Sequence, residues 1–290
     1  MKSTLTFLAA MAISLPAFAE ITVIDDDAHF AEGPTVVDGT LYYVEYAAQT
    51  LMRWDGELSE VWRRDGCGPA AAIPFQAGFL ITCYDSGEVV QVSSTGETLS
   101  VISRDADGNP FVGPNDFTDD GAGGVWMTTS GPWASEPIEG AVYHIAPDLT
   151  VRQMADDLHY ANGIARNGTA LFVAESEAAR IVMFDIGDDG ALTNRRLFVR
   201  LGQVDETLGP WTYPDGMKFG PDGNLWVGSY AMGRIVAVSP EGEFVTALDI
   251  PAATAPNLAF GPEGEIYVMA VDQTDAAPYA GKVYKIDGLQ

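Results

Sequence analysis

Apolar and polar residues alternate along most of this chain in short runs, which are interrupted by glycine, proline, asparagine and aspartate. The clearest example is residues 213–229, YPDGMKFGPDGNLWVGS, where two short apolar runs flank the turn GPDG at residues 220–223. Proline presets φ and glycine accepts the positive φ of a tight turn, so this pattern predicts a β-hairpin. The predicted hairpin places Asp215 at the free start of its first strand.

The same hairpin pattern recurs along the chain. Copies begin near residues 32, 68, 113, 161, 213 and 255, at intervals of 36 to 52 residues. A period in this range is typical of solenoids and propellers. Each copy is followed by a polar bend and then by an alternating run that predicts a third strand. These third strands are expected at Gln49–Trp54, Glu88–Val92, Gly140–Ile145, Arg180–Phe184, Gly233–Val238 and Gly281–Ile286.

A fourth, less regular strand follows, for example at Thr98–Ile102 or Phe244–Asp249. Four short strands per repeat make a propeller blade, so the sequence predicts an all-β fold, a six-bladed β-propeller. A β-sandwich is the alternative, but a sandwich needs no six-fold repeat. We expect residues 21–24 to complete the last blade and close the ring. Because no linker rich in proline, glycine or serine divides the chain, we expect residues 20–290 to form a single domain.

The first 19 residues have a different pattern. Lys2 precedes an apolar run over residues 5–15, and the motif AFA at residues 17–19 follows a proline. This order is typical of a secretory signal peptide that is cleaved after Ala19. A membrane anchor is the alternative, but the apolar run is short for a membrane span. We therefore expect export, with the periplasm as the destination.

The charge of the chain is strongly negative. It contains 41 Asp and Glu residues against 15 Lys and Arg residues, which gives a formal net charge of −26. Such a surface repels nucleic acid and anionic lipid, so we expect neither as a partner. Solubility in salty surroundings accounts for most of these carboxylates. We expect a monomer whose partner is a small molecule.

The chain has two cysteines, Cys67 and Cys83. Cys67 precedes a predicted inner strand, and Cys83 ends the strand that returns beside it. In an oxidising compartment such a pair is a disulfide candidate. No histidine lies at a spacing that fits metal binding by these cysteines, so we expect a disulfide.

Propeller geometry brings one position of each repeat together. The first strand of every blade lines the central channel, so the residues that open these strands converge at one end of the axis. The expected openers are Glu32, Ala70 or a neighbour, Asn115 with Asp116, Asn162, Asp215 and Asn257. Their carboxylate and amide oxygens suit a hard divalent cation. Ca²⁺ and Mg²⁺ fit best, Mn²⁺ is an option, and Zn²⁺ fits less well without His or Cys ligands.

Each opener also has a simpler explanation, because Asn and Asp at strand starts are common turn residues that hydrogen-bond their own backbone. The cation hypothesis rests on Glu32, Asn162 and Asp215, which lie beside glycine or proline at matching points of different repeats. The glycine that follows each of them leaves room where strands crowd around the axis.

Together these motifs resemble the SMP-30/gluconolactonase/regucalcin-like family over essentially the whole mature chain. The resemblance rests on EGP at Glu32, PND at Asn115, NG at Asn162, and PDGM at Asp215 with the downstream GNLWV at residues 223–227. It implies a six-bladed propeller with one divalent cation on the axis, held by Glu32, Asn162 and Asp215. It also implies that Asn115 is a further ligand or a substrate contact, and that Asp215 doubles as the acid/base residue.

The chain departs from the family pattern in its third repeat. Many members carry an arginine two residues before the asparagine of that blade, where this chain has Gly113. The rim candidates are Tyr46, Trp133, His159, Tyr160, Trp211 and Tyr230. Of these, Tyr46, Trp133 and His159 are predicted substrate contacts. Such an aromatic rim favours a substrate less polar than a sugar lactone, unless the rings only pack between blades.

These features predict an exported, divalent-metal-dependent lactonase. The cation would polarise the lactone carbonyl and lower the pKa of water, and Asp215 would take a proton as water attacks. A covalent serine mechanism is disfavoured because the chain has no G-x-S-x-G motif. Two alternatives stay open: an ester or organophosphate-type hydrolase on the same scaffold, and a non-catalytic propeller that binds a ligand or protein and uses the cation for structure.

Overall fold

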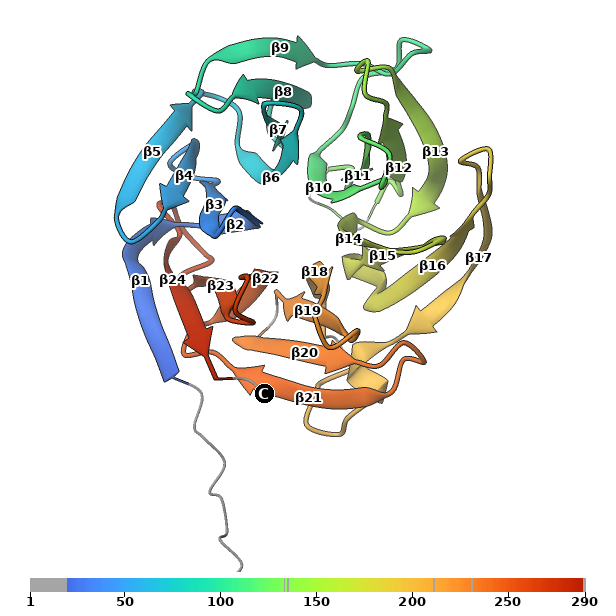
Figure 1. Cartoon of the computed structure of the whole chain (residues 1–290). Coiled ribbons are helices and arrows are strands. Elements are labelled where there is room, and N and C mark those ends of the chain that lie inside the picture. Colours follow the sequence, from blue (N-terminus) through green and yellow to red (C-terminus); the bar gives the residue numbers. More distant parts are fainter. Residues whose placement is uncertain (1–19, 133, 135, 211, 231, 289–290) are drawn as a thin grey trace, which may run out of the picture.

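The computed structural model describes residues 20–132, 134, 136–210, 212–230 and 232–288. These residues form six four-stranded blades arranged around a central axis (Figure 1). The predicted six-bladed β-propeller is therefore confirmed. Two single-turn 3₁₀ helices, η1 (Ser176–Ala178) and η2 (Leu201–Gln203), lie in the loops.

Each blade runs from an inner strand at the axis to an outer strand at the rim. Blade 1 consists of β2 (Ala31–Val37), β3 (Thr40–Glu45), β4 (Thr50–Trp54) and β5 (Leu58–Arg63). Blade 2 consists of β6 (Pro69–Phe75), β7 (Gly78–Cys83), β8 (Glu88–Ser93) and β9 (Thr98–Ile102). Blade 3 consists of β10 (Pro114–Asp119), β11 (Val125–Thr129), β12 (Gly140–Ile145) and β13 (Val151–Leu158).

The second half of the chain repeats this plan. Blade 4 consists of β14 (Ala161–Asn167), β15 (Ala170–Glu175), β16 (Arg180–Ile186) and β17 (Leu192–Val199). Blade 5 consists of β18 (Pro214–Phe219), β19 (Leu225–Ser229), β20 (Arg234–Val238) and β21 (Phe244–Asp249). Blade 6 consists of β22 (Thr254–Phe260), β23 (Ile266–Val271), β24 (Ala280–Asp287) and β1 (Glu20–His29).

The N-terminal strand closes the ring, as expected. Strand β1 pairs antiparallel with β24, from Glu20 opposite Asp287 to His29 opposite Ala280. It is longer than the predicted residues 21–24. The first and last segments of the described chain thus share one blade, which removes the open sheet edges that a linear array would leave.

The inner strands share one irregularity that matters for the site. In each of them the pairing register shifts by a residue shortly after the strand begins, for example between Glu32 and Thr35 in β2 and between Pro214 and Met217 in β18. Such a β-bulge bends the strand and redirects its side chains.

Glycine allows the inner strands to approach one another at this point. A Cβ atom on Gly33 would lie 2.1 Å from the Cα of Ala71, and one on Gly163 would lie 2.0 Å from the carbonyl oxygen of Asp215. No side chain fits in either place. This is the crowding around the axis that the sequence predicts.

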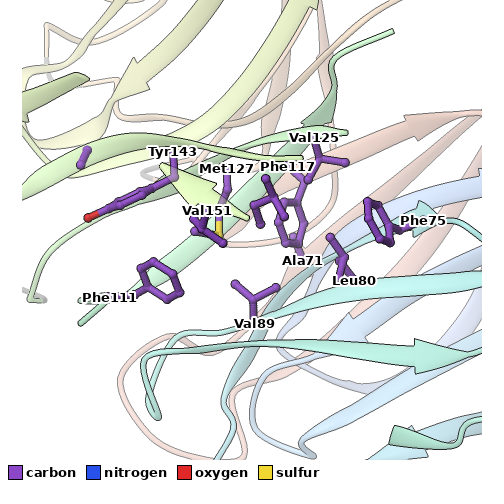
Figure 2. Close-up of a cluster of buried hydrophobic side chains, with 12 residues drawn as sticks. Ala71, Phe75, Leu80, Val89, Phe111, Phe117, Val125, Met127, Tyr143 and Val151 are labelled. Carbon is purple, nitrogen blue, oxygen red and sulfur yellow. The ribbon is translucent and has the colours of Figure 1, made fainter. Parts of the chain in front are cut away.

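Apolar side chains fill the spaces between neighbouring blades. Figure 2 shows the cluster between blades 2 and 3, in which Leu80 and Val89 face Phe117, Met127 and Tyr143. A fully buried side chain of this size stabilises the fold by roughly 1.5–3 kcal/mol. Inter-blade packing of this kind fixes the inner strands relative to one another.

Cys67 and Cys83 are joined by a disulfide, with their Cα atoms 4.5 Å apart. Both are fully buried. The bond ties the segment before β6 to the end of β7, at the axial end of blade 2. Within the described ranges, no helix has the length and apolar character needed to cross a membrane.

Candidate active site

A cavity of about 240 Å³ opens on the propeller axis. Its lining consists of Phe30, Glu32, Tyr46, Ala70, Tyr84, Asn115, Tyr160, Asn162, Asp215, Tyr230, Thr274 and Tyr279. We call this cavity the axial chamber. It contains residues from every blade, so the closed ring is what assembles it.

Four predicted openers meet in the axial chamber: Glu32, Asn115, Asn162 and Asp215. Each is the second residue of its inner strand, just ahead of the bulge. Asp215 and Asn162 are buried, with 5% and 7% of their surface exposed. Ala70 lines the chamber at the same position of blade 2 and brings only a methyl group. The repeat therefore locates the oxygen cluster correctly.

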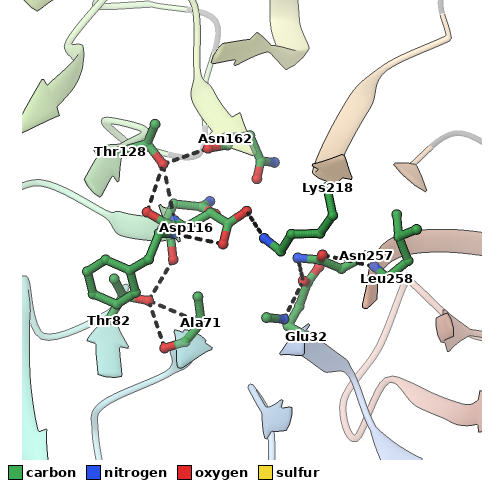
Figure 3. Close-up of polar contacts among 12 residues, drawn as sticks. Glu32, Ala71, Thr82, Asp116, Thr128, Asn162, Lys218, Asn257 and Leu258 are labelled. Atoms are coloured by element: carbon green, nitrogen blue, oxygen red, sulfur yellow. Dashed lines mark hydrogen bonds and ion pairs between the residues drawn. The ribbon is translucent and has the colours of Figure 1, made fainter. Parts of the chain in front are cut away.

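Hydrogen bonds from neighbouring blades hold the openers in place. Thr82 Oγ1 accepts the amide of Ala71 at 2.8 Å and donates to the carbonyl oxygen of Asn115 at 2.6 Å. Thr128 Oγ1 repeats the arrangement one blade further, donating to the carbonyl oxygen of Asn162 at 2.6 Å (Figure 3). Each buried threonine thus locks the inner strand of the next blade.

The Asn115 side chain is fixed in the same way. Its Nδ2 donates to Ser130 Oγ at 2.9 Å, and Ser130 Oγ donates in turn to the carbonyl oxygen of Ala161 at 2.8 Å. With its amide nitrogen engaged, Asn115 has its amide oxygen left for a ligand.

Asn257 does not line the chamber as an opener, which corrects the prediction. Its Oδ1 accepts the amide of Leu258 at 2.9 Å, just as Oδ1 of Asp116 accepts the amide of Phe117 at 2.7 Å. Counted back from the end of its strand, Asn257 holds the same position as Asp116, one residue further along than the openers Asn115 and Asp215. From there its Nδ2 donates to Oε2 of Glu32 at 3.0 Å (Figure 3).

A partly buried ion pair lies beside these residues. Nζ of Lys218, from β18, is 3.4 Å from Oδ2 of Asp116, from β10 (Figure 3). The Asp116 side chain is 4% exposed and the Lys218 side chain 27%. The two residues are 102 positions apart in sequence. No local sequence pattern marks Lys218, and its role was not predicted.

Burial raises the pKa values of the two carboxyls in the chamber. The pKa of Glu32 is raised to about 7, chiefly by burial. Hydrogen bonds from Asn257 and the Gly33 amide pull it down, and the charge of Asp116 pushes it up. Burial also raises the pKa of Asp215 well above its usual range, and the charges of Glu32 and Asp116 add to this. Without a further positive charge, these carboxylates destabilise one another.

The donor set fits a hard divalent cation. The chamber offers carboxylate oxygens from Glu32 and Asp215 and amide oxygens from Asn115 and Asn162, the ligands that Ca²⁺ and Mg²⁺ prefer. With Asp116 and Lys218 included, this part of the described channel holds three carboxylates and one ammonium, a formal charge of −2 when all are ionised. A divalent cation would balance it.

No group of three or more His, Cys, Asp or Glu side chains suited to a metal occurs in the described ranges. The candidate ligands in the chamber are therefore two carboxylates together with the asparagine oxygens. Zn²⁺ is disfavoured by the same set, because it contains no imidazole or thiolate.

The predicted rim residues have different outcomes. Tyr46, Tyr160 and Tyr230 line the axial chamber. His159 is absent from the described lining, and its backbone amide donates to Oε1 of Glu175 at 3.0 Å. Trp133 and Trp211 lie outside the described residues.

Four further residues of the lining were not predicted from the sequence: Phe30, Tyr84, Thr274 and Tyr279. A positional signal exists for two of them. Tyr84 directly follows the second strand of its blade, as Tyr46 does in blade 1. Phe30 directly precedes an inner strand, as Tyr160 does, and both have positive φ, 55° and 57°. Aligning the repeats at their ends as well as at their hairpins would have found these two residues.

Comparison with known proteins identifies the family. Residues 30–272 match the SMP-30/Gluconolactonase/LRE-like region. The chain belongs to this family. It is 25% identical to regucalcin of Oryctolagus cuniculus over 288 residues, covering 92% of this chain and 93% of that protein. The family resemblance drawn from the hairpin motifs is confirmed.

Solved structures of the family share the fold. A gluconolactonase from Xanthomonas campestris superposes with a TM-score of 0.76 at 21% identity, over 92% of this chain and 89% of that one. A calcium-binding regucalcin from Agrobacterium tumefaciens gives 0.76 at 18% identity, over 91% and 92%. At these identities the likeness establishes the propeller architecture of this family member.

Proposed function

We propose that this protein is a divalent-cation-dependent hydrolase that opens lactones, which are cyclic carboxylic esters. The observation that carries the proposal is the cluster of carboxylate and amide oxygens in the axial chamber, which together with Asp116 and Lys218 has a formal charge of −2 when all are ionised. Membership of a family that includes a gluconolactonase, and a structural relative described as calcium-binding, add support. Ca²⁺ is the proposed cation.

Glu32, Asn162 and Asp215 would hold the cation, and Asn115 would complete its shell or contact the substrate. When bound, the cation supplies Lewis-acid polarisation of the lactone carbonyl and lowers the pKa of a coordinated water. The protein contributes the rigid placement of these oxygens, which the inter-blade hydrogen bonds of Thr82 and Thr128 secure.

Asp215 is the proposed proton acceptor. Its carboxyl group is buried, lines the chamber and receives a side-chain hydrogen bond from Asn162. A carboxylate held there can take the proton from a water molecule that attacks the carbonyl, and can then protonate the departing ring oxygen.

The test is acid release from a panel of lactones, followed with a pH indicator. Protein stripped with EDTA is assayed alone and after Ca²⁺, Mg²⁺, Mn²⁺ or Zn²⁺ is added back separately. We expect no release from stripped protein and recovery with Ca²⁺. If folded, cation-loaded protein releases no acid from any lactone, the proposal is wrong. Aryl esters, organophosphates and non-hydrolysed ligands would then be tested in that order.

A further inference from the structure

The wall of the axial chamber is aromatic. Six of its twelve described lining residues carry aromatic rings: Phe30, Tyr46, Tyr84, Tyr160, Tyr230 and Tyr279. The described lining contains no lysine, arginine or histidine. The polar openers share the chamber with these rings, so a substrate that reaches them also lies against aromatic surface.

Phe30 lies at the centre of this wall. Its ring centroid is 5.7 Å from that of Tyr46, 5.7 Å from that of Tyr279 and 6.4 Å from that of Tyr230. These distances are typical of favourable aromatic pairs. The wall is therefore a connected set of rings that support one another across several blades.

At three successive blade junctions, an aromatic side chain on one side of the junction packs against a glycine or serine on the other side. A Cβ atom on Gly68 would lie 2.9 Å from the ring of Tyr46, and a Cβ atom on Gly113 would lie 2.8 Å from the ring of Tyr84. At the next junction the order reverses, because Tyr160 lies beside the small Ser130. Each of these junctions thus contributes one ring to the chamber, and the two glycine positions have no room for a second large side chain.

This packing explains why position 113 is a glycine. A side chain at that position would meet the Tyr84 ring and would also place its Cβ 2.6 Å from the carbonyl oxygen of Gly131. An aromatic ring therefore fills the space where a longer polar side chain would have to start. The chamber consequently lacks a cationic hydrogen-bond donor at this junction.

Three of the five tyrosines in the described lining donate their hydroxyl hydrogen to another protein group. The Tyr46 hydroxyl donates to Oδ1 of Asp85 at 2.9 Å. The Tyr160 hydroxyl donates to that of Tyr84 at 3.1 Å, and the Tyr84 hydroxyl donates to the carbonyl oxygen of Gly131 at 3.1 Å. Their hydrogens are committed, so the rings present carbon surface to a ligand. Along these rings the hydroxyl oxygens of a polyhydroxylated substrate would lose water without gaining a hydrogen-bond donor.

We propose that the axial chamber selects uncharged lactones that carry a flat, apolar group, such as a fused benzene ring, and discriminates against polyhydroxylated sugar lactones. This rests on the proposed lactonase function. The volume of about 240 Å³ lies near the lower end for ligand pockets, so the substrate is a small molecule of one or two rings.

The reaction is an ordinary ester hydrolysis. The oxygen of water bonds to the carbonyl carbon, the ring C–O bond breaks, and the departing oxygen takes a proton to give a hydroxy acid. No oxidant or reductant is needed.

The decisive experiment measures binding separately from turnover. Lactams resist this hydrolysis, so calorimetry with Ca²⁺ present compares dihydroisoquinolinone, a benzo-fused lactam, with valerolactam and gluconolactam. We expect the benzo-fused lactam to bind at least about tenfold more tightly than either. Equal or tighter binding of gluconolactam overturns the proposal.

A second experiment compares the turnover of the corresponding lactones. We expect kcat/KM for isochromanone to exceed that for gluconolactone by at least about tenfold. Faster turnover of gluconolactone overturns the selectivity proposal and leaves the lactonase function intact. Preference for the benzo-fused lactam without turnover of any lactone supports the selectivity of the chamber and contradicts the lactonase function.

A substitution tests whether the aromatic wall causes the preference for the benzo-fused lactam. Phe30→Leu keeps an apolar side chain and removes the central ring, and it should weaken binding of the benzo-fused lactam by roughly fivefold with little effect on valerolactam. Phe244→Leu, at a partly exposed phenylalanine on β21, is the matched control and should change neither. Tyr46→Leu replaces Phe30→Leu if that variant does not fold. Unchanged lactam binding in the folded wall variant overturns the proposal.

Discussion

The Lys218→Met substitution tests the charge balance beside the axial chamber. It removes the ammonium that lies 3.4 Å from Oδ2 of Asp116. At an effective dielectric constant of about 20, two unit charges at that separation attract by about 5 kcal/mol, before the loss of hydration is counted. Removing one partner of a buried pair lowers the free energy of unfolding by roughly 3–5 kcal/mol. Because 27% of the Lys218 side chain is exposed, we expect the lower end, about 3 kcal/mol.

Lys285→Met is the matched control. The Lys285 side chain is also 27% exposed, but its partner Asp287 is 43% exposed, so this pair is screened by water. We expect that control to lose less than about 1 kcal/mol. Urea unfolding in EDTA, followed by circular dichroism, measures both. Adding Asp116→Asn to Lys218→Met removes the unpaired carboxylate and should recover most of the loss.

The same variant links the ion pair to the proposed cation. Without Lys218 the cluster formally carries a third excess negative charge, so Ca²⁺ should stabilise Lys218→Met by more than it stabilises the wild type. Two results would refute this reasoning. One is a loss in EDTA no larger than that of Lys285→Met, and the other is equal stabilisation of variant and wild type by Ca²⁺.

Three further predictions concern the chemistry and the scaffold. Asp215→Asn should lower kcat for lactone hydrolysis by roughly 10²–10⁴-fold with an unchanged circular dichroism spectrum. The exposed control Asp188→Asn should keep a kcat near that of the wild type. Comparable kcat values in the two variants would show that Asp215 is not the proton acceptor. Burial alone would raise the pKa of Glu175, but hydrogen bonds from Arg180 and a backbone amide hold it below the usual 4.5. The ionised Glu175 therefore stabilises the fold fully above pH 4.5, and this stabilisation is lost as the pH falls through the lower folded-state pKa. Glu175→Gln should therefore reduce the fall of Tm at acid pH, as measured by scanning calorimetry. An unchanged fall of Tm would contradict this role of Glu175. Replacing Cys67 and Cys83 by alanine should lower the free energy of urea unfolding by roughly 3 kcal/mol, because the bond closes a loop of 16 residues; equal stability of wild type with and without reductant would contradict this.

The fold was predictable because its signals are local and repeated. Each hairpin carries its own turn residues and alternating strands, and strands Gly140–Ile145 and Phe244–Asp249 begin and end where the sequence predicts. A blade is also one structural unit, so an error in one copy is corrected by the others. Closure by β1 was predictable because the last repeat lacks a fourth strand of its own.

The site was predictable only where it follows the repeat. Glu32 and Asp215 hold equivalent positions, so the period alone brings them together. Asn257 was assigned one position too early, because the hairpin pattern does not show where the bulge shifts the register. The Asp116–Lys218 contact joins side chains from blades 3 and 5 across the channel, and no periodicity encodes such a pairing.

The aromatic wall was also only partly predictable from the sequence. The ring of Tyr84 and the missing side chain of Gly113 compensate for each other at a blade junction. The two residues lie 29 positions apart in different copies of the repeat. The sequence indicated an aromatic rim, but the three-dimensional structure of the blade junctions was needed to show which rings face the chamber and why.

The measurement we would make first is a calorimetric titration of EDTA-stripped protein with Ca²⁺, for the wild type, for Glu32→Gln and for the exposed control Glu57→Gln. The wild type and Glu57→Gln should bind one cation per chain with similar affinity. Glu32→Gln should bind at least about tenfold more weakly, because it loses a charged ligand in a buried site. Absence of binding by the wild type, or equal affinity in Glu32→Gln, would contradict a catalytic cation on the propeller axis.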